Sequence, residues 1–79
     1  MSCPLNDLKP GQSGTVSGFA KLDDGAEHLM QMGVLEGADI SVLRYAPTGD
    51  PVEIRVMGYS LSLRLADAAN VLVDNVTKS

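Results

Sequence analysis

Apolar and polar residues alternate along much of the second half of the chain. The alternation is clearest in residues 52–56, where Val, Ile and Val are separated by Glu and Arg, and it recurs in residues 40–45 and 59–64. Successive side chains of a strand point to opposite faces, so this pattern predicts strands with one buried and one solvated face. Turn-forming residues fill segment 46–51, and the Met-Gly pair at 57–58 predicts a tight turn with the glycine at positive φ.

Two further strands are predicted nearer the ends of the chain. Residues 15–19 contain Thr, Val and Phe, with Gly18 allowing a bend or bulge, and residues 71–73 are Val-Leu-Val. Pro4 and Pro10 are expected to hold the first segment out of a helix. About five short strands in so short a chain indicate a mostly β fold, a small barrel whose closure would remove exposed sheet edges.

One helix is predicted, over residues 26–32. Asp24 is a suitable N-cap, and the glutamate three residues later completes a capping-box pattern. Apolar residues recur at helical spacing along one side, so this short helix is expected to dock on the sheet. Gly33 is the expected C′ residue at positive φ, and Val34 is expected to fold back on Leu29 as a Schellman cap requires.

The length of 79 residues is enough for one domain. We expect its core to span residues 5–74 and residues 75–79 to form a flexible tail. Residues 65–70 can add one helical turn. A domain of this size has little interior for a deep catalytic cleft, and the sequence offers no set of nucleophile, base and orienting group. We therefore predict that the protein is not an enzyme.

The charge balance restricts the class of partner. Six basic residues stand against ten acidic ones, for a formal net charge of −4. The basic residues are scattered, which argues against nucleic acid and anionic membranes as partners. No apolar run approaches the ~20 residues that span a bilayer, and the first residues do not resemble a signal peptide. With Cys3 as the single cysteine, these features predict a cytoplasmic protein.

The single histidine, His28, is the candidate for a metal ligand. Asp24 lies one helical turn before it and Glu27 is its neighbour, so these three side chains are candidate ligands of one metal site. Zn²⁺ takes about four protein ligands, usually Cys or His, and this chain has one of each, with Cys3 in the extended N-terminal segment. We therefore predict no tight metal site and no cofactor, and we interpret His28 as a solvated side chain of the helix.

Several short motifs together resemble the FeoA family. The similarity runs from about Leu5 to Val73, and the turn and the helix end are its most specific parts. The motifs are Leu5-x-x-Leu8-x-x-Gly11, Leu29-x-x-Met32-Gly33, Gly37, Ala46-Pro47-x-Gly49-Asp50-Pro51, Gly58 and Leu63-Arg64.

This resemblance implies a fold and a function. The implied fold is an SH3-like barrel of about five strands with one short helix. The implied function is that of a non-catalytic cytoplasmic accessory protein, which docks on the cytoplasmic GTPase region of a FeoB-type ferrous iron transporter and modulates it. The alternative is a metal-responsive regulatory module related to the C-terminal domain of iron-dependent repressors. That alternative normally needs a DNA-binding domain, and no helix-turn-helix fits in this chain.

The expected contact with a partner lies on the predicted helix. Glu27, His28 and Gln31 are expected to face solvent, with Met30 as an apolar anchor among them. Members of the FeoA family often carry basic residues just before the Leu-x-x-Met-Gly stretch, whereas Glu27 and His28 stand there in this chain. The contact is therefore expected to differ in charge from that of its relatives.

Overall fold

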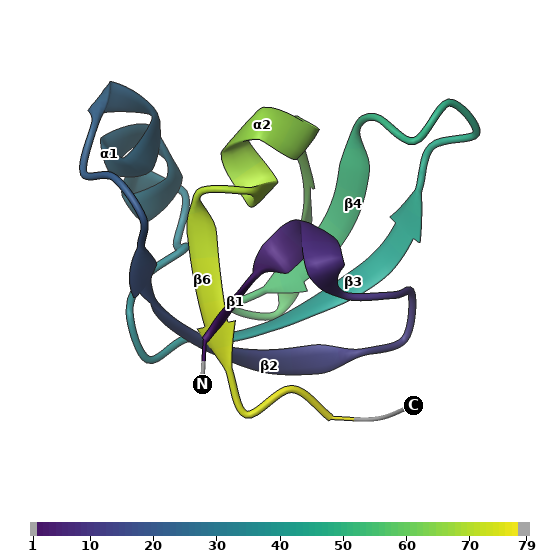
Figure 1. Ribbon diagram of the computed structural model, residues 1–79, viewed down its shortest axis with the longest axis horizontal. Coiled ribbons are helices and arrows are strands. Elements are labelled where there is room, and N and C mark those ends of the chain that lie inside the picture. The colour runs from purple at the N-terminus through teal and green to yellow at the C-terminus, as the bar shows by residue number, and fades with distance from the viewer. Residues whose placement is uncertain (1, 78–79) are drawn as a thin grey trace.

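Six antiparallel strands form a single twisted sheet in this computed structural model, which describes residues 2–77. The strands follow the spatial order β1-β6-β2-β3-β4-β5. A 3₁₀ helix, η1, and two α-helices, α1 and α2, lie between them (Figure 1). The elements are β1 (Cys3–Pro4), η1 (Leu5–Asp7), β2 (Ser13–Phe19), α1 (Asp24–Gln31), β3 (Asp39–Tyr45), β4 (Val52–Val56), β5 (Tyr59–Leu63), α2 (Leu65–Ala68) and β6 (Val71–Asp74).

The core lies on the concave side of this sheet. The predicted alternation in β4 is confirmed, because Val52, Ile54 and Val56 are buried while Arg55 is exposed. The two α-helices lie at different places around the strands, with α1 at one end of the sheet and α2 between β6 and β4 in the view of Figure 1. The other buried side chains of the cluster are Leu5, Leu8, Val16, Leu29, Val34, Ile40, Val42, Leu63, Ala68, Val71 and Val73.

Both residues of the tight turn between β4 and β5 have positive φ, whereas only the glycine was predicted to have it. Gly58 takes positive φ, 85°, as predicted, but Met57 does so as well, with φ of 54°. Two positive φ values in a two-residue loop match the type I′ turn, whose twist fits that of the flanking strands. The predicted bulge at Gly18 is also confirmed, because the register between β2 and β6 shifts between Val16 and Gly18.

The N-terminal segment corrects one expectation. Pro4 does not exclude a helix, because it lies at the N-cap of η1. The N–H group that proline lacks would make no intrahelical hydrogen bond at that position. The Tyr45 hydroxyl is within hydrogen-bonding distance of two carbonyl oxygens of this segment, at 2.5 Å from Leu8 and 3.2 Å from Asn6. Burial, and to a smaller extent the Asp7 carboxylate, raise the pKa of the Tyr45 phenol.

The C-terminal segment returns to β2. Val76 packs against the core, and the Thr77 N–H donates to the Ser13 carbonyl at 2.8 Å. Of the tail predicted to be flexible, residues 78–79 lie outside the described part of the chain. No helix within residues 2–77 is long and apolar enough to cross a membrane.

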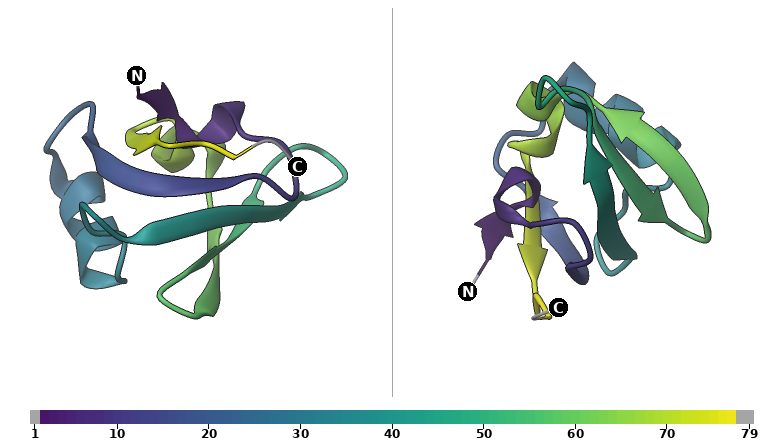
Figure 2. Two further views of the ribbon diagram at one scale, coloured as in Figure 1. Left: turned by 90° about the horizontal axis from the view of Figure 1, so that it is seen from below. Right: turned by 90° about the vertical axis from the view of Figure 1, so that its right-hand side faces the viewer.

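Closure of the barrel differs from the sequence prediction. The predicted mostly β fold is confirmed, but among residues 2–77 the hydrogen-bonded pairing of strands does not run all the way round, and β1 and β5 lie at the two ends of the strand order. Figure 2 (right) shows β5 as the outermost strand, beyond β4. The sheet therefore keeps edges that a fully paired barrel would lack.

Candidate functional site

The helix that carries the predicted contact residues begins two residues earlier than predicted. The N-cap is Asp23, whose carboxylate oxygen Oδ1 accepts the Ala26 N–H at 2.9 Å. Asp24 is therefore the first helical residue, and the predicted capping box starting at Asp24 is wrong. The sequence allowed both assignments because the two aspartates are adjacent and either can cap a helix.

The predicted cap at the end of α1 is confirmed, although the helix ends at Gln31, one residue earlier than predicted. Gly33 has φ of 103°, the Gly33 N–H donates to the Met30 carbonyl, and the Val34 N–H donates to the Leu29 carbonyl at 3.0 Å. These two hydrogen bonds define the Schellman motif, and both Val34 and Leu29 are buried. The Tyr59 hydroxyl of β5 donates to the Met32 carbonyl, which ties this helix end to the β4–β5 hairpin.

The four predicted contact residues lie on the outer side of α1, and we call them the α1 surface. Glu27, His28 and Gln31 are exposed, and Met30 is half-buried at the margin of this surface. The opposite side of the helix buries Leu29 and Ala26 against the sheet. Met30 is therefore neither a core residue nor fully solvated, and it presents part of a flexible apolar side chain beside polar neighbours.

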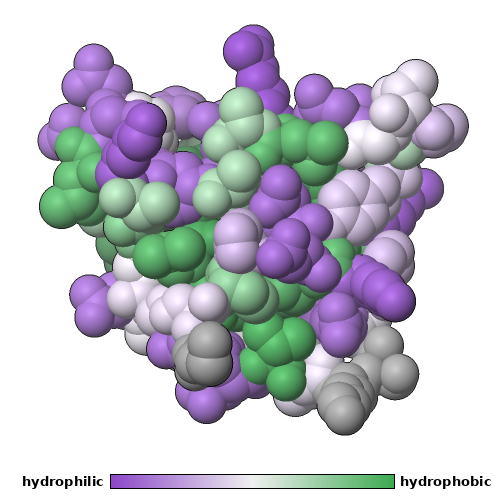
Figure 3. Space-filling model, viewed as in Figure 1, coloured by the Kyte–Doolittle hydropathy of each residue, from purple (hydrophilic) through white to green (hydrophobic). Residues whose placement is uncertain are grey.

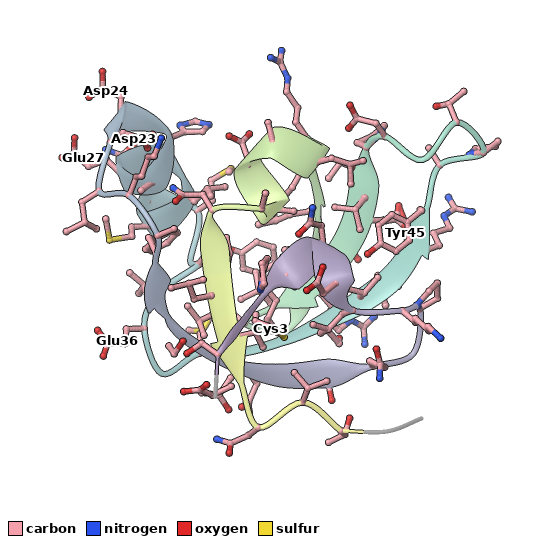
Figure 4. The ribbon with its side chains drawn as sticks, in the orientation of Figure 1. Cys3, Asp23, Asp24, Glu27, Glu36 and Tyr45 are labelled. Carbon is pink, nitrogen blue, oxygen red and sulfur yellow. The ribbon has the colours of Figure 1, made fainter. Side chains whose placement is uncertain are left out.

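Acidic side chains surround the start of this helix. Asp23, Asp24 and Glu27 lie together at its N-terminal end in Figure 4. All three are exposed. Negative charge at a helix N-terminus is favourable because it faces the positive end of the helix dipole. The same charges make this end of the molecule complementary to a basic partner surface.

One exposed apolar residue beside the helix was not singled out in the sequence. Leu22 is 82% exposed and lies in the connection from β2 to α1. The side chain of Asn70 fixes this connection, since it accepts the Lys21 N–H at 2.7 Å and donates to the Lys21 carbonyl at 2.9 Å. Figure 3 shows apolar surface over the same region, next to hydrophilic side chains of α1. The only signal for it in the sequence is an apolar residue outside every predicted element.

The candidate metal ligands do not form a cluster. Within residues 2–77, no three His, Cys, Asp or Glu side chains are close enough together to hold a metal ion. His28 is exposed on α1, while Cys3 is half-buried in β1, where it pairs with Val73. The conclusion that the protein has no tight metal site remains a prediction.

Comparisons with known proteins agree with this fold. The sequence model of the FeoA domain matches residues 3–75. A fusion protein of Fe(2+) transport protein A and the Fe(2+) transporter FeoB from Porphyromonas gingivalis is 38% identical over 75 residues. That match covers 95% of this chain and 9% of the fusion protein, so the chain spans a small part of this curated relative.

Solved structures show the same similarity in three dimensions. The FeoA-like protein of Clostridium acetobutylicum is 32% identical, with a TM-score of 0.90 over 99% of this chain and 91% of that one. The FeoA of Stenotrophomonas maltophilia, described as a prokaryotic SH3 domain protein and solved with zinc, is 27% identical, with a TM-score of 0.79 over 90% of this chain and 88% of that one.

A manganese-dependent transcriptional repressor shares the fold as well. It has a TM-score of 0.83 over 91% of this chain and 36% of that one, at 17% identity. This similarity shows the fold alone. The match of the family sequence model over residues 3–75, together with the FeoA structures, shows that the chain belongs to the FeoA family and has the SH3-like fold of its relatives.

Proposed function

We propose that this chain is a cytoplasmic protein that docks on the cytoplasmic GTPase region of a FeoB-type ferrous iron transporter and modulates iron uptake. The partner is suggested by the Porphyromonas gingivalis relative, in which transport protein A and the transporter FeoB are fused in one protein. Fusion keeps the two domains at a high effective concentration relative to each other, which supports a contact between their counterparts.

The α1 surface is the proposed contact. The observation that carries this assignment is the half-buried Met30 at the margin of the exposed side chains of Glu27, His28 and Gln31. An apolar anchor bordered by polar side chains is a common arrangement in interface hot spots. The helix is also held at both ends, by the Asp23 cap and by the Tyr59 hydroxyl, so little ordering is needed when a partner binds.

The charges of this surface define the complementary partner surface. Asp23, Asp24 and Glu27 make the start of α1 acidic, so the docking face of the GTPase region is expected to be basic around an apolar pocket for Met30. The alternative, a metal-responsive regulatory module, is supported only by the fold shared with the manganese-dependent repressor. We therefore favour the docking protein.

Titration calorimetry of the full chain with the isolated GTPase region tests the contact. Met30→Asp should weaken binding by about tenfold or more, because it places a charge in an apolar pocket. Glu27→Ala should weaken it by no more than about threefold, since exposed rim charges contribute little.

Met57→Asp is the matched control. It makes the same chemical change at a methionine of the β4–β5 turn that is 61% exposed, and aspartate tolerates its positive φ of 54°. Its affinity should equal that of the wild type. Thermal unfolding verifies that each variant is folded. A folded Met30→Asp protein that binds normally would show that α1 is not the contact.

A further inference from the structure

We propose that the outer edge of β5 binds an extended segment of a partner protein in which apolar and acidic side chains alternate, by addition of that segment as an antiparallel strand. This proposal concerns a surface separate from the α1 surface and does not depend on the docking function proposed above. It follows from the backbone of the strand, from its sequence and from the charges beside it.

The backbone of β5 offers free hydrogen-bonding groups. The two-residue turn makes Val56 and Tyr59 the hydrogen-bonded pair that closes the hairpin, and pairs alternate from there along the strands. Ser60 and Ser62 therefore direct their N–H and C=O groups away from β4. Within residues 2–77 no hydrogen bond from another element reaches these groups, and both residues are exposed.

The sequence of β5 does nothing to protect this edge. Natural sheets commonly protect an edge strand with a charge, a proline, a bulge or short length. The other edge strand, β1, has two residues and includes Pro4. In contrast, β5 is Tyr-Ser-Leu-Ser-Leu, five residues in unbroken register with β4 and without charge or proline. The two edges therefore differ, and β5 is the one suited to strand addition.

Hydrogen bonds to other elements hold β5 in place at both of its ends. At its start, the Tyr59 hydroxyl donates to the Met32 carbonyl of α1. Just after its end, the Leu65 N–H donates to the Asp50 carboxylate at 3.1 Å. An edge that is fixed at both ends loses little conformational freedom when another strand pairs with it, which favours binding.

Charges beside the edge select acidic side chains on one face of the incoming strand. Arg55 is the cross-strand partner of Ser60, and Arg64 directly follows β5. Neither arginine makes an ion pair in the part of the chain that the structure describes, whereas the nearby Glu53 carboxylate is paired with Arg44 at 3.3 Å. Arg55 lines a hollow over β3 with Asp39 and Ser41. Because Ser60 on its other side is small, the long Arg55 side chain can turn across β5 to a strand that would lie about 10 Å from β4.

The other face of the edge selects apolar side chains. Tyr59 and Leu61 lie on the side of β5 that faces the core, yet Tyr59 is 46% exposed and Leu61 is only half-buried. An incoming strand would place every second side chain beside these two residues. A valine or isoleucine at those positions would cover apolar surface that now meets water.

An NMR titration of the isotopically labelled full chain tests the proposal. The probe is an acetylated, amidated six-residue peptide that alternates valine and glutamate. The amide signals of Ser60 and Ser62 should shift on binding, and their hydrogen exchange should slow. A peptide alternating valine and lysine should bind about tenfold more weakly or worse, and so should a valine–glutamate peptide whose alternate backbone nitrogens are methylated.

Two variants of one residue separate strand addition from other contacts. Ser62→Pro removes the outward N–H group at a position where an edge strand tolerates proline, and it should weaken peptide binding about tenfold or more. Ser62→Ala keeps the N–H group and should bind like the wild type. The proposal is overturned if folded Ser62→Pro binds normally, or if the peptide leaves the Ser60 and Ser62 amides unchanged. It is also overturned if those amides are already protected in a dimer of this chain, because the edge would then belong to a second copy.

Discussion

At the scale of single residues, Gly33 is a position where both the backbone conformation and the neighbouring side chains disfavour any residue but glycine. Its φ of 103° is unfavourable for any residue with a side chain. A Cβ atom there would also lie 2.8 Å from the Tyr59 hydroxyl oxygen and 3.3 Å from the Met57 Cγ. The sequence predicted the positive φ from the helix end alone, but it could not predict this contact with the hairpin.

Gly33→Ala should therefore lower the free energy of unfolding by about 1 kcal/mol or more. The measurement is urea unfolding followed by circular dichroism. Gly25→Ala is the control, because Gly25 lies within α1 at ordinary φ and alanine favours helix, so stability should stay the same or rise. Equal unfolding midpoints for the two variants would contradict the assigned role of Gly33.

The phenol of Tyr45 makes the free energy of unfolding depend on pH. Its phenol hydroxyl lies within hydrogen-bonding distance of the Leu8 and Asn6 carbonyls, and burial, with the Asp7 carboxylate, raises its pKa above the ordinary 10.0. The folded state therefore holds the proton more tightly than the unfolded state does. The resulting stabilisation is complete below pH 10 and is lost as pH rises from there through the higher pKa of the folded protein.

Tyr45→Phe should cost about 1 kcal/mol at neutral pH, because the hydrogen bonds are lost. The difference from the wild type should shrink when unfolding is measured above pH 10. A difference that stays constant up to the alkaline limit of folding would show that the phenol is not held in its protonated form.

At the scale of elements, the sequence predicted most strands well because their signals are local. Alternation located β3, β4 and β5, and the Val-Leu-Val run located β6. The N-cap of α1 was misplaced by one residue, from Asp23 to Asp24, because adjacent aspartates give the same local signal. The strand β1 was missed altogether, since it has two residues and exists only through pairing with β6.

The corrected start of α1 can be measured directly. Asp23→Ala should lower the free energy of unfolding by about 1 kcal/mol, because it removes the acceptor of the Ala26 N–H. Asp24→Ala removes only a favourable charge near the helix dipole and should cost about 0.3 kcal/mol. If thermal unfolding shows the larger loss for Asp24→Ala, then Asp24 rather than Asp23 caps the helix.

At the scale of the whole molecule, the sequence predicted the fold class but not the open edge. The pattern of each strand says which face is buried and nothing about which strand lies next to it. The end position of β5 in the strand order follows instead from the pairing of β6 with β1 and β2. The α1 surface was predictable in part, because helical spacing places Glu27 and Gln31 opposite the buried Leu29, and His28 opposite the buried Ala26.

For the whole molecule we also predict the absence of a tight metal site. We expect no stoichiometric, submicromolar binding of Fe²⁺ or Zn²⁺ to the full chain, because His and Cys ligands are too few for such a site. Calorimetry under anaerobic conditions measures this, with His28→Ala as the comparison. Tight binding by the wild type that disappears in His28→Ala would contradict the prediction.

The most direct test of the docking account is ferrous iron uptake in cells of the source organism. Three strains are compared: the wild type, one lacking this chain, and one expressing Met30→Asp at wild-type levels. We expect deletion to change the uptake rate and Met30→Asp to reproduce the rate of the deletion strain, since both lose the contact with the transporter. Equal uptake in all three strains would contradict the docking account.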